Sequence, residues 1–292
     1  MNLQGIWTAL ITPFDAERVD EEGLAGLVER QIEAGVHGLV ACGTTGETPT
    51  LTADEYARVV RLVVETARSR VPVLAGTGTN CTRTTIERTQ IARALGVDGA
   101  LVVAPYYNKP QQAGLIAHFS AVAREGGLPV VLYNVPGRTG VNIAPDTIAA
   151  LSRVPRIVGV KEASGSVDAV REVVRLAEKS FAVLSGDDGL ALASFALGAS
   201  GVVSVASNVA PREMVAIWNA WTSGRVQEAQ DLDRRLAPLY KALFLEPNPV
   251  PCKAAAHLLG WIRSDAVRAP LARASEQTRE ALRNALSLPA TS

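Results

Sequence analysis

Cysteine is scarce in this chain of 292 residues. Cys42, Cys81 and Cys252 are odd in number, lie far apart, and include no CxxC motif. Such a set suggests neither a disulfide framework nor a cysteine zinc site. We expect all three to be small buried hydrophobic residues.

Net charge is absent, because 29 basic residues balance 29 acidic ones. No basic stripe suggests a nucleic acid or a membrane surface as partner, so we expect a small substrate. The first residues, MNLQGIWTALITPF, lack the basic start of a secretion signal. No later run approaches the roughly 18 uncharged apolar residues of a membrane span. These absences predict a cytoplasmic protein.

Metal and dinucleotide signatures are also missing. No GxGxxG motif follows the first apolar run, which counts against a dinucleotide-binding sheet. The three histidines lie far apart and none follows an apolar run, so a zinc-dependent aldolase has little support. They are His37, His118 and His257. We therefore expect neither a metal nor a cofactor.

Eight short apolar runs alternate with turns and amphipathic stretches of helical length. The runs are GIWTALIT, GLVACG, VPVLAG, GALVVAP, LPVVLYN, RIVGVKE, FAVLSG and GVVSVAS. Helix starts are indicated by a capping box at Thr52 and Glu55, by Pro145, and by Ser166. Eight strand-then-helix units predict an α/β fold, a closed (β/α)8 TIM barrel, rather than an open doubly wound sheet.

From Pro211 the pattern is helical almost to the end, which is more than a barrel of roughly 250 residues needs. We expect a catalytic barrel over residues 1–224 and a C-terminal helical extension over 225–292. The segment EPNPVP at 246–251 is predicted to be a proline-rich turn.

One lysine interrupts an apolar strand in the segment IVGVKEASG at 157–165. Burial disfavours an ammonium group, and the neutral amine of a desolvated lysine is a nucleophile suited to carbonyl carbon. Taken alone, Lys161 is more simply interpreted as a lysine that reaches water or pairs with Glu162.

Polar residues follow nearly every apolar run, and the active sites of this fold lie at the carboxyl ends of the strands. Tyr107 and Tyr133 are therefore predicted to point at the same barrel mouth as Lys161. Tyr133 taken alone is more simply a core aromatic residue whose hydroxyl finds a carbonyl.

Three further strand-end segments have an ordinary and a functional interpretation. The turn at 43–47 is either a simple glycine turn or a set of backbone N–H groups aimed at a carboxylate. Arg138 is either a solvated surface residue or a bidentate carboxylate ligand. Asp187 and Asp188 are expected to cap helices rather than to bind a metal.

Five motifs together resemble the dihydrodipicolinate synthase family. They are GTTGE at 43–47, YYN at 106–108, YNVPGRTG at 133–140, GVKEASG at 159–165 and SGDD at 185–188. The resemblance extends from the first strand through EPNP and covers nearly the whole chain. The lysine strand and the GTTGE turn are shared with the wider superfamily of pyruvate-dependent Schiff-base aldolases, which includes N-acetylneuraminate lyase. PGRTG together with YYN is specific to this family.

The resemblance implies a lyase that joins pyruvate to L-aspartate 4-semialdehyde through an imine on Lys161, in the diaminopimelate route to lysine. Thr44, Tyr107 and Tyr133 would form a hydroxyl relay for protons. Substrate-binding roles are implied for Thr45, Arg138, Gly186 and Val203. In relatives the residue at the position of Tyr107 enters the neighbouring subunit's site, so a homodimer or homotetramer is expected.

The resemblance also bears on regulation. Lysine-inhibited relatives bind the end product at an interface where this chain keeps Asn80 and Tyr106 but has Thr84 in place of a glutamate. A buried ammonium group without a carboxylate loses a strong contact, so weak or absent inhibition by lysine is predicted.

Three alternatives remain open at this point. An aldolase acting on a sugar acid would have no need for Arg138 in PGRTG. A non-catalytic barrel that senses a keto acid would be expected to lose Lys161 or Tyr133. A structural or partner-binding role would explain none of the polar strand ends.

Overall fold

The computed structural model describes residues 1–287. The eight predicted runs form parallel strands that close into a barrel in the order β1-β10-β9-β8-β7-β6-β5-β4. Their bounds are β1 Gly5–Ala9, β4 Gly38–Ala41, β5 Val73–Gly76, β6 Gly99–Val103, β7 Val130–Asn134, β8 Ile157–Glu162, β9 Ala182–Ser185 and β10 Gly201–Ser204. The predicted TIM barrel is confirmed.

Helices follow the strands, and the three predicted helix starts are confirmed. Thr52 and Glu55 form a capping box, Pro145 is the first residue of its helix, and the Ser166 side chain accepts the backbone N–H of Ala169. The helices up to β10 are α1 Glu21–Glu33, α2 Ala53–Ala67, α3 Thr82–Ala94, α4 Gln112–Glu125, α5 Pro136–Thr139, α6 Pro145–Leu151, α7 Val167–Leu176 and α8 Ala191–Ala196. Short 3-10 helices are η1 Thr48–Thr50, η2 Asp188–Leu190 and η3 Ala206–Asn208.

A small antiparallel hairpin between β1 and α1 is not indicated by the sequence pattern. Its strands, β2 Phe14–Asp15 and β3 Arg18–Val19, have two residues each. Alternation of apolar and polar residues needs about four residues to be recognised. The hairpin is therefore too short to leave a signal.

Within the described residues, four α-helices follow β10, as the helical pattern after Pro211 predicts. They are α9 Pro211–Thr222, α10 Val226–Ala242, α11 Val250–Leu258 and α12 Glu276–Leu286. The expected boundary between residues 224 and 225 falls in the turn between α9 and α10. A separate C-terminal extension stays a prediction, and residues 288–292 of it lie outside the described residues.

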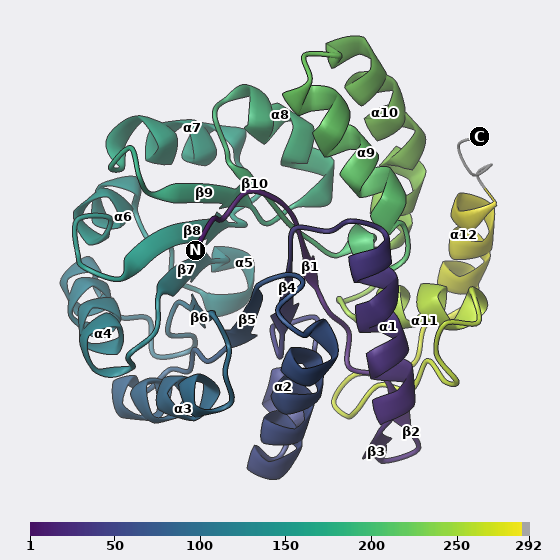
Figure 1. The fold of residues 1–292 in the computed structure, drawn as a ribbon, viewed down its shortest axis with the longest axis horizontal. Coiled ribbons are helices and arrows are strands. Elements are labelled where there is room, and N and C mark those ends of the chain that lie inside the picture. The colour runs from purple at the N-terminus through teal and green to yellow at the C-terminus, as the bar shows by residue number, and fades with distance from the viewer. Residues whose placement is uncertain (288–292) are drawn as a thin grey trace. The chain divides into compact units, whose positions relative to one another are not determined.

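Two compact units can be distinguished along the chain. One comprises Met1–Gly5 and Pro72–Val203, and in it α3, α4, α6 and α7 lie along the outer side of β6 to β9 (Figure 1). The other comprises Ile6–Val71 and the chain from Ser204 onward, and in it α10 packs against α9 and α12.

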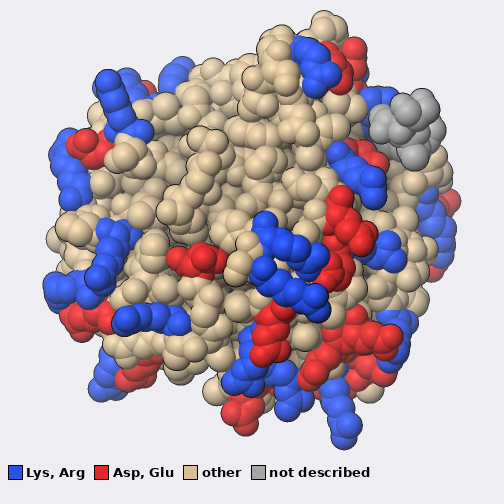
Figure 2. Space-filling view, viewed as in Figure 1, with Lys and Arg blue, Asp and Glu red and all other residues tan. Residues whose placement is uncertain are grey.

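The surface shows the balance of charge that the composition requires. On the face drawn in Figure 2, basic and acidic side chains lie next to one another. The structure also contains exposed ion pairs, such as Arg70 with Glu29 at 2.7 Å. Within residues 1–287, no helix is both long and apolar enough to cross a membrane.

The cysteines only partly follow expectation. Cys42 and Cys252 are buried, but Cys81 is exposed, so the expectation that all three are buried is wrong. Cys81 is the N-cap residue of α3, and its side chain is exposed at this end of the helix.

Candidate active site

Lys161 lies one residue before the carboxyl end of β8 and is only 5% exposed. The β7–β8 register pairs it with Tyr133, which is 6% exposed. Partners in a parallel ladder project from the same face of the sheet. The Lys161 amine accordingly lies 4.3 Å from the centre of the Tyr133 ring. The structure therefore places the Tyr133 ring beside the Lys161 amine.

Glu162 does not pair with Lys161, because successive residues of a strand point to opposite faces. Its carboxylate accepts hydrogen bonds from Asn134 Nδ2 at 2.8 Å and from the Ser164 backbone N–H at 2.7 Å. No carboxylate among the described residues forms an ion pair with Lys161. Of the two parts of the simpler interpretation, the ion pair with Glu162 is therefore wrong.

Gly186, the residue after β9, leaves the space that the Lys161 side chain occupies. A Cβ at Gly186 would lie 2.5 Å from the Ala163 Cβ and 3.0 Å from Lys161 Cε. Val203 is fully buried in β10 and follows Val202, which pairs with Ser185 just before Gly186. The structure thus brings Lys161, Tyr133 and Gly186 together.

Tyr107, in the loop after β6, and Arg138, on α5, lie on two segments that are joined by a hydrogen bond. The Tyr107 backbone N–H donates to Thr139 O at 3.3 Å, and Arg138 is exposed on α5. Tyr107 is 88% exposed and has a φ of 73°, a left-handed conformation that is rare for a bulky residue. Its side chain is therefore held out into solvent by a strained backbone.

The two proposed regulatory residues lie near this loop. Asn108 Nδ2 donates to the backbone oxygen of Asn80 at 2.8 Å, and Tyr106 is 40% exposed. Asp187 caps η2 by accepting the Gly189 N–H at 2.9 Å, so the predicted capping role is confirmed for this residue. Within residues 1–287, no cluster of three metal-ligating side chains is present.

The turn at 43–47 belongs to the second unit and is held by many contacts. Thr45 is 2% exposed, and its hydroxyl oxygen accepts a hydrogen bond from Asn248 Nδ2 at 2.9 Å. Thr12 Oγ1 donates to Gly46 O at 2.8 Å, and Thr48 Oγ1 donates to Gly43 O at 3.1 Å. These side-chain contacts hold the backbone of the turn in place.

Glu47, the last residue of this turn, forms a buried ion pair that the sequence interpretation missed. Its Oε1 lies 2.7 Å from Lys253 Nζ, and both side chains are almost completely buried. Burial lowers the pKa of Lys253 to about 8, against the opposing effect of Glu47. A lone lysine in the apolar run VPCKAAAHLL is the same signal that identified Lys161, so this residue could have been found.

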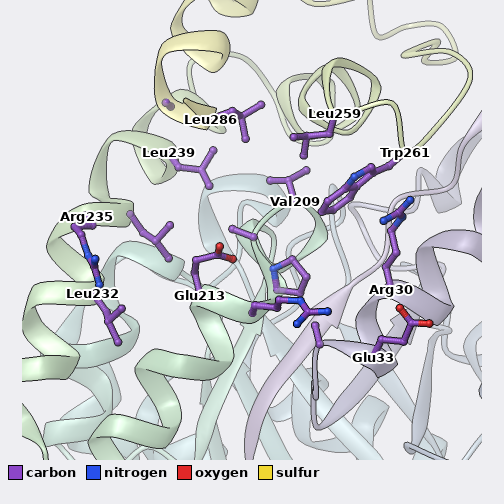
Figure 3. A pocket seen from close by; sticks show the side chains of 16 residues that line it. Arg30, Glu33, Val209, Glu213, Leu232, Arg235, Leu239, Leu259, Trp261 and Leu286 are labelled. Atoms are coloured by element: carbon purple, nitrogen blue, oxygen red, sulfur yellow. The ribbon is translucent and has the colours of Figure 1, made fainter. Parts of the chain in front are cut away.

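A cavity of about 330 Å³ in the second unit contains none of the predicted site residues. Leu232, Leu239, Val209 and Leu259 line it, and the arginine Arg30 lies 4.9 Å above the ring of Trp261 (Figure 3). Its titratable groups are arginines and two glutamates, which supply no amine or hydroxyl nucleophile. We do not assign it to the chemistry.

A closed parallel barrel with a buried lysine at the end of one strand and a tyrosine beside it is typical of barrel enzymes that use an amine as nucleophile. Comparison with known proteins agrees with this class. The model of the dihydrodipicolinate synthetase family matches residues 2–288. The chain belongs to this family.

Individual relatives are similar over nearly their whole length. The 4-hydroxy-tetrahydrodipicolinate synthase of Methanothrix thermoacetophila is 49% identical, over 97% of this chain and 96% of the relative. The Acinetobacter baumannii dihydrodipicolinate synthase, solved in complex with pyruvate, has a TM-score of 0.95 and 44% identity, over 97% of this chain and 98% of that one. A monomeric dihydrodipicolinate synthase variant has a TM-score of 0.95 and 43% identity, over 97% of this chain and 95% of that one.

Proposed function

We propose that Lys161 is the amine on which this chain carries out the reaction of its family. That reaction condenses pyruvate with L-aspartate 4-semialdehyde to 4-hydroxy-tetrahydrodipicolinate, in the diaminopimelate route to lysine. The observation that carries the assignment is the buried Lys161 amine, placed over the Tyr133 ring and without a carboxylate partner among the described residues. No observation favours a sugar acid as substrate.

The proposed steps follow from the chemistry of an amine and a keto acid. The Lys161 amine adds to the ketone carbon of pyruvate, and loss of water gives a protonated imine. The positive nitrogen accepts electrons as the methyl group loses a proton, which gives an enamine. The enamine carbon then attacks the aldehyde carbon of the semialdehyde. The amino group of that substrate finally displaces Lys161 as the ring closes.

Each step moves a proton, and we assign the transfers to hydroxyl groups. The contact between the Lys161 amine and the Tyr133 ring supports this role for Tyr133, whose hydroxyl has no hydrogen-bond partner among the described residues. Thr44 and Tyr107 join the relay in this proposal on the strength of the GTTGE and YYN motifs.

The two substrates each carry a carboxylate that must be held. Thr45 and the neighbouring N–H groups of its turn are proposed to bind the carboxylate of pyruvate. Arg138 is proposed to bind that of the semialdehyde, because a guanidinium group suits a carboxylate. Gly186 leaves room for the Lys161 side chain and, with Val203, is proposed to border the substrate.

We further propose that the protein works as a homodimer or homotetramer in the cytoplasm. The exposed and strained Tyr107 supports association, because a partner subunit would cover this aromatic side chain. A monomeric variant exists among solved relatives, so the assembly needs its own measurement. Sedimentation across a dilution series, combined with activity at each concentration, tests it. If the monomer were fully active, the proposal that a neighbouring subunit supplies Tyr107 to the proton relay would be refuted.

The test of the function is reductive trapping. The protein is incubated with pyruvate and borohydride, and the modified residue is located by mass spectrometry. We expect one adduct, on Lys161, and none in Lys161→Arg. Product formation from L-aspartate 4-semialdehyde is then compared with that from other aldehydes. Absence of an adduct at Lys161 would refute the proposed chemistry.

A further inference from the structure

The turn at 43–47 rests on a fully buried ion pair. Glu47 is 2% exposed and has a left-handed backbone, with a φ of 53°. Its Oε1 accepts from Lys253 Nζ at 2.7 Å, and its Oε2 accepts from the Arg268 backbone N–H at 3.0 Å. Lys253 Nζ also lies 4.0 Å from the centre of the Phe14 ring. Both carboxylate oxygens of Glu47 are therefore fixed in direction.

Stability alone does not account for such a pair. Removing two charges from water costs about as much as their attraction returns, and apolar residues of similar volume usually serve as well. The ion pair instead fixes the position of the Glu47 carboxylate, because a buried carboxylate must stay in contact with the Lys253 ammonium group. Since Glu47 is part of the turn, the position of its side chain constrains the backbone of the turn.

A second contact fixes the hydroxyl of Thr45. A threonine hydroxyl has one proton to donate and two lone pairs that accept. Asn248 Nδ2 donates to this oxygen at 2.9 Å and so occupies one lone pair. The Thr45 proton then remains available to another acceptor, such as a carboxylate. Asn248 and Lys253 both come from the EPNPVPCK segment, far from the turn in sequence.

We propose that Lys253 and Asn248 are positioning residues for pyruvate: Lys253 fixes the turn through Glu47, and Asn248 orients the Thr45 hydroxyl toward the substrate carboxylate. This inference rests on the proposed role of Thr45 in holding pyruvate. Neither residue touches the reacting atoms. Loss of either contact should therefore weaken the binding of pyruvate more than it slows the later chemistry.

The experiment measures the pyruvate concentration that gives half-maximal borohydride trapping at Lys161, together with KM and kcat. The variants are Lys253→Met and Asn248→Ala, and Lys241→Met is the control, because Lys241 is an exposed lysine on α10. We expect the two test variants to raise the half-saturating concentration and the KM for pyruvate about tenfold or more, which is the effect of losing the hydrogen bond from the Thr45 hydroxyl to the charged carboxylate of pyruvate. The kcat at saturating pyruvate should change less, and the control should match the unaltered protein.

Folding is controlled separately. Lys253→Met leaves Glu47 buried without a cation and can fail to fold, whereas Glu47→Gln/Lys253→Met removes both charges. If the double variant folds, its half-saturating concentration should still be raised, because the directed contact is gone. Asn248→Ala removes only a neutral hydrogen bond and supplies the test if neither Lys253 variant folds.

The outcomes are distinguishable. Trapping curves of Asn248→Ala and of the folded Lys253 variant that coincide with that of the unaltered protein would overturn the positioning role, even if the melting temperatures fall. Failure of the unaltered protein to be labelled would instead refute the proposed function. A label on Lys253 rather than Lys161 would overturn both assignments, and the mass of the labelled peptide separates these cases.

Discussion

Gly186→Ala tests the geometry around Lys161 with a single methyl group. Carbon atoms in contact normally lie about 3.5–4.0 Å apart. The new Cβ would lie 2.5 Å from the Ala163 Cβ and 3.0 Å from Lys161 Cε. Ala163 cannot move easily, because its N–H donates to Asn134 O at 2.8 Å in the β7–β8 ladder. The backbone at Gly186 or Ala163 must nevertheless shift to relieve the contact between the two Cβ atoms, and the Lys161 side chain, which meets the same Cβ, is displaced as well.

The expected cost has two parts. Overpacking of a buried site should lower the free energy of unfolding by about 1–3 kcal/mol. Displacement of the amine by about 1 Å should slow imine formation by about 100-fold, because the reacting atoms no longer meet in line. Denaturant unfolding measures the first part, and the rate of borohydride trapping with pyruvate measures the second.

The matched control is Gly26→Ala on α1, where an added Cβ meets nothing within 4 Å. Alanine in a helix should leave trapping unchanged and raise stability by about 0.5–1 kcal/mol. If Gly186→Ala trapped pyruvate at the unaltered rate, the crowding at Lys161 would have no effect on its reactivity. The geometric reasoning would then be refuted.

Three further predictions concern catalysis, pH and regulation. Tyr133→Phe should lower kcat about 10²–10⁴-fold while pyruvate is still trapped at Lys161, and loss of trapping would place Tyr133 in imine formation itself. Burial lowers the pKa of His118 to about 4 from 6.5, so the unfolded chain binds a proton first as the pH falls. The free energy of unfolding should therefore fall by about 2 kcal/mol from pH 7 to pH 5. Denaturant titrations at the two pH values should show a smaller loss in His118→Gln. Lysine at micromolar concentration should leave the rate of product formation unchanged. Strong inhibition would contradict the prediction that Thr84, in place of a glutamate, weakens the binding of lysine.

The strands and helix starts could be predicted because their signals are local. Eight apolar runs, a capping box at Thr52 and an N-cap at Ser166 depend on residues a few positions apart. The hairpin β2–β3 could not be predicted, because two-residue strands carry no periodicity. The prediction that Cys81 is buried was wrong, because composition alone does not show whether a small residue lies in the core or at the surface.

The site could be predicted only in part. Lys161 stood out because a charge in an apolar strand is anomalous, and Tyr133 because it ends the preceding strand. The pairing of Glu47 with Lys253 joins residues 206 positions apart, and no local pattern records such a distance. The same holds for Asn248, which lies in the predicted proline-rich turn and also donates to the Thr45 hydroxyl, far away in the sequence.

The sequence by itself determined the order of strands and helices, the anomalous lysine and the family, since each is written in residue types and short spacings. Only the tertiary structure decided that Lys161 meets the Tyr133 ring rather than Glu162, and that Gly186 must lack a side chain. The register between two strands sets which side chains share a face, and packing sets which atoms touch. Both arise from contacts between segments that are distant in the chain.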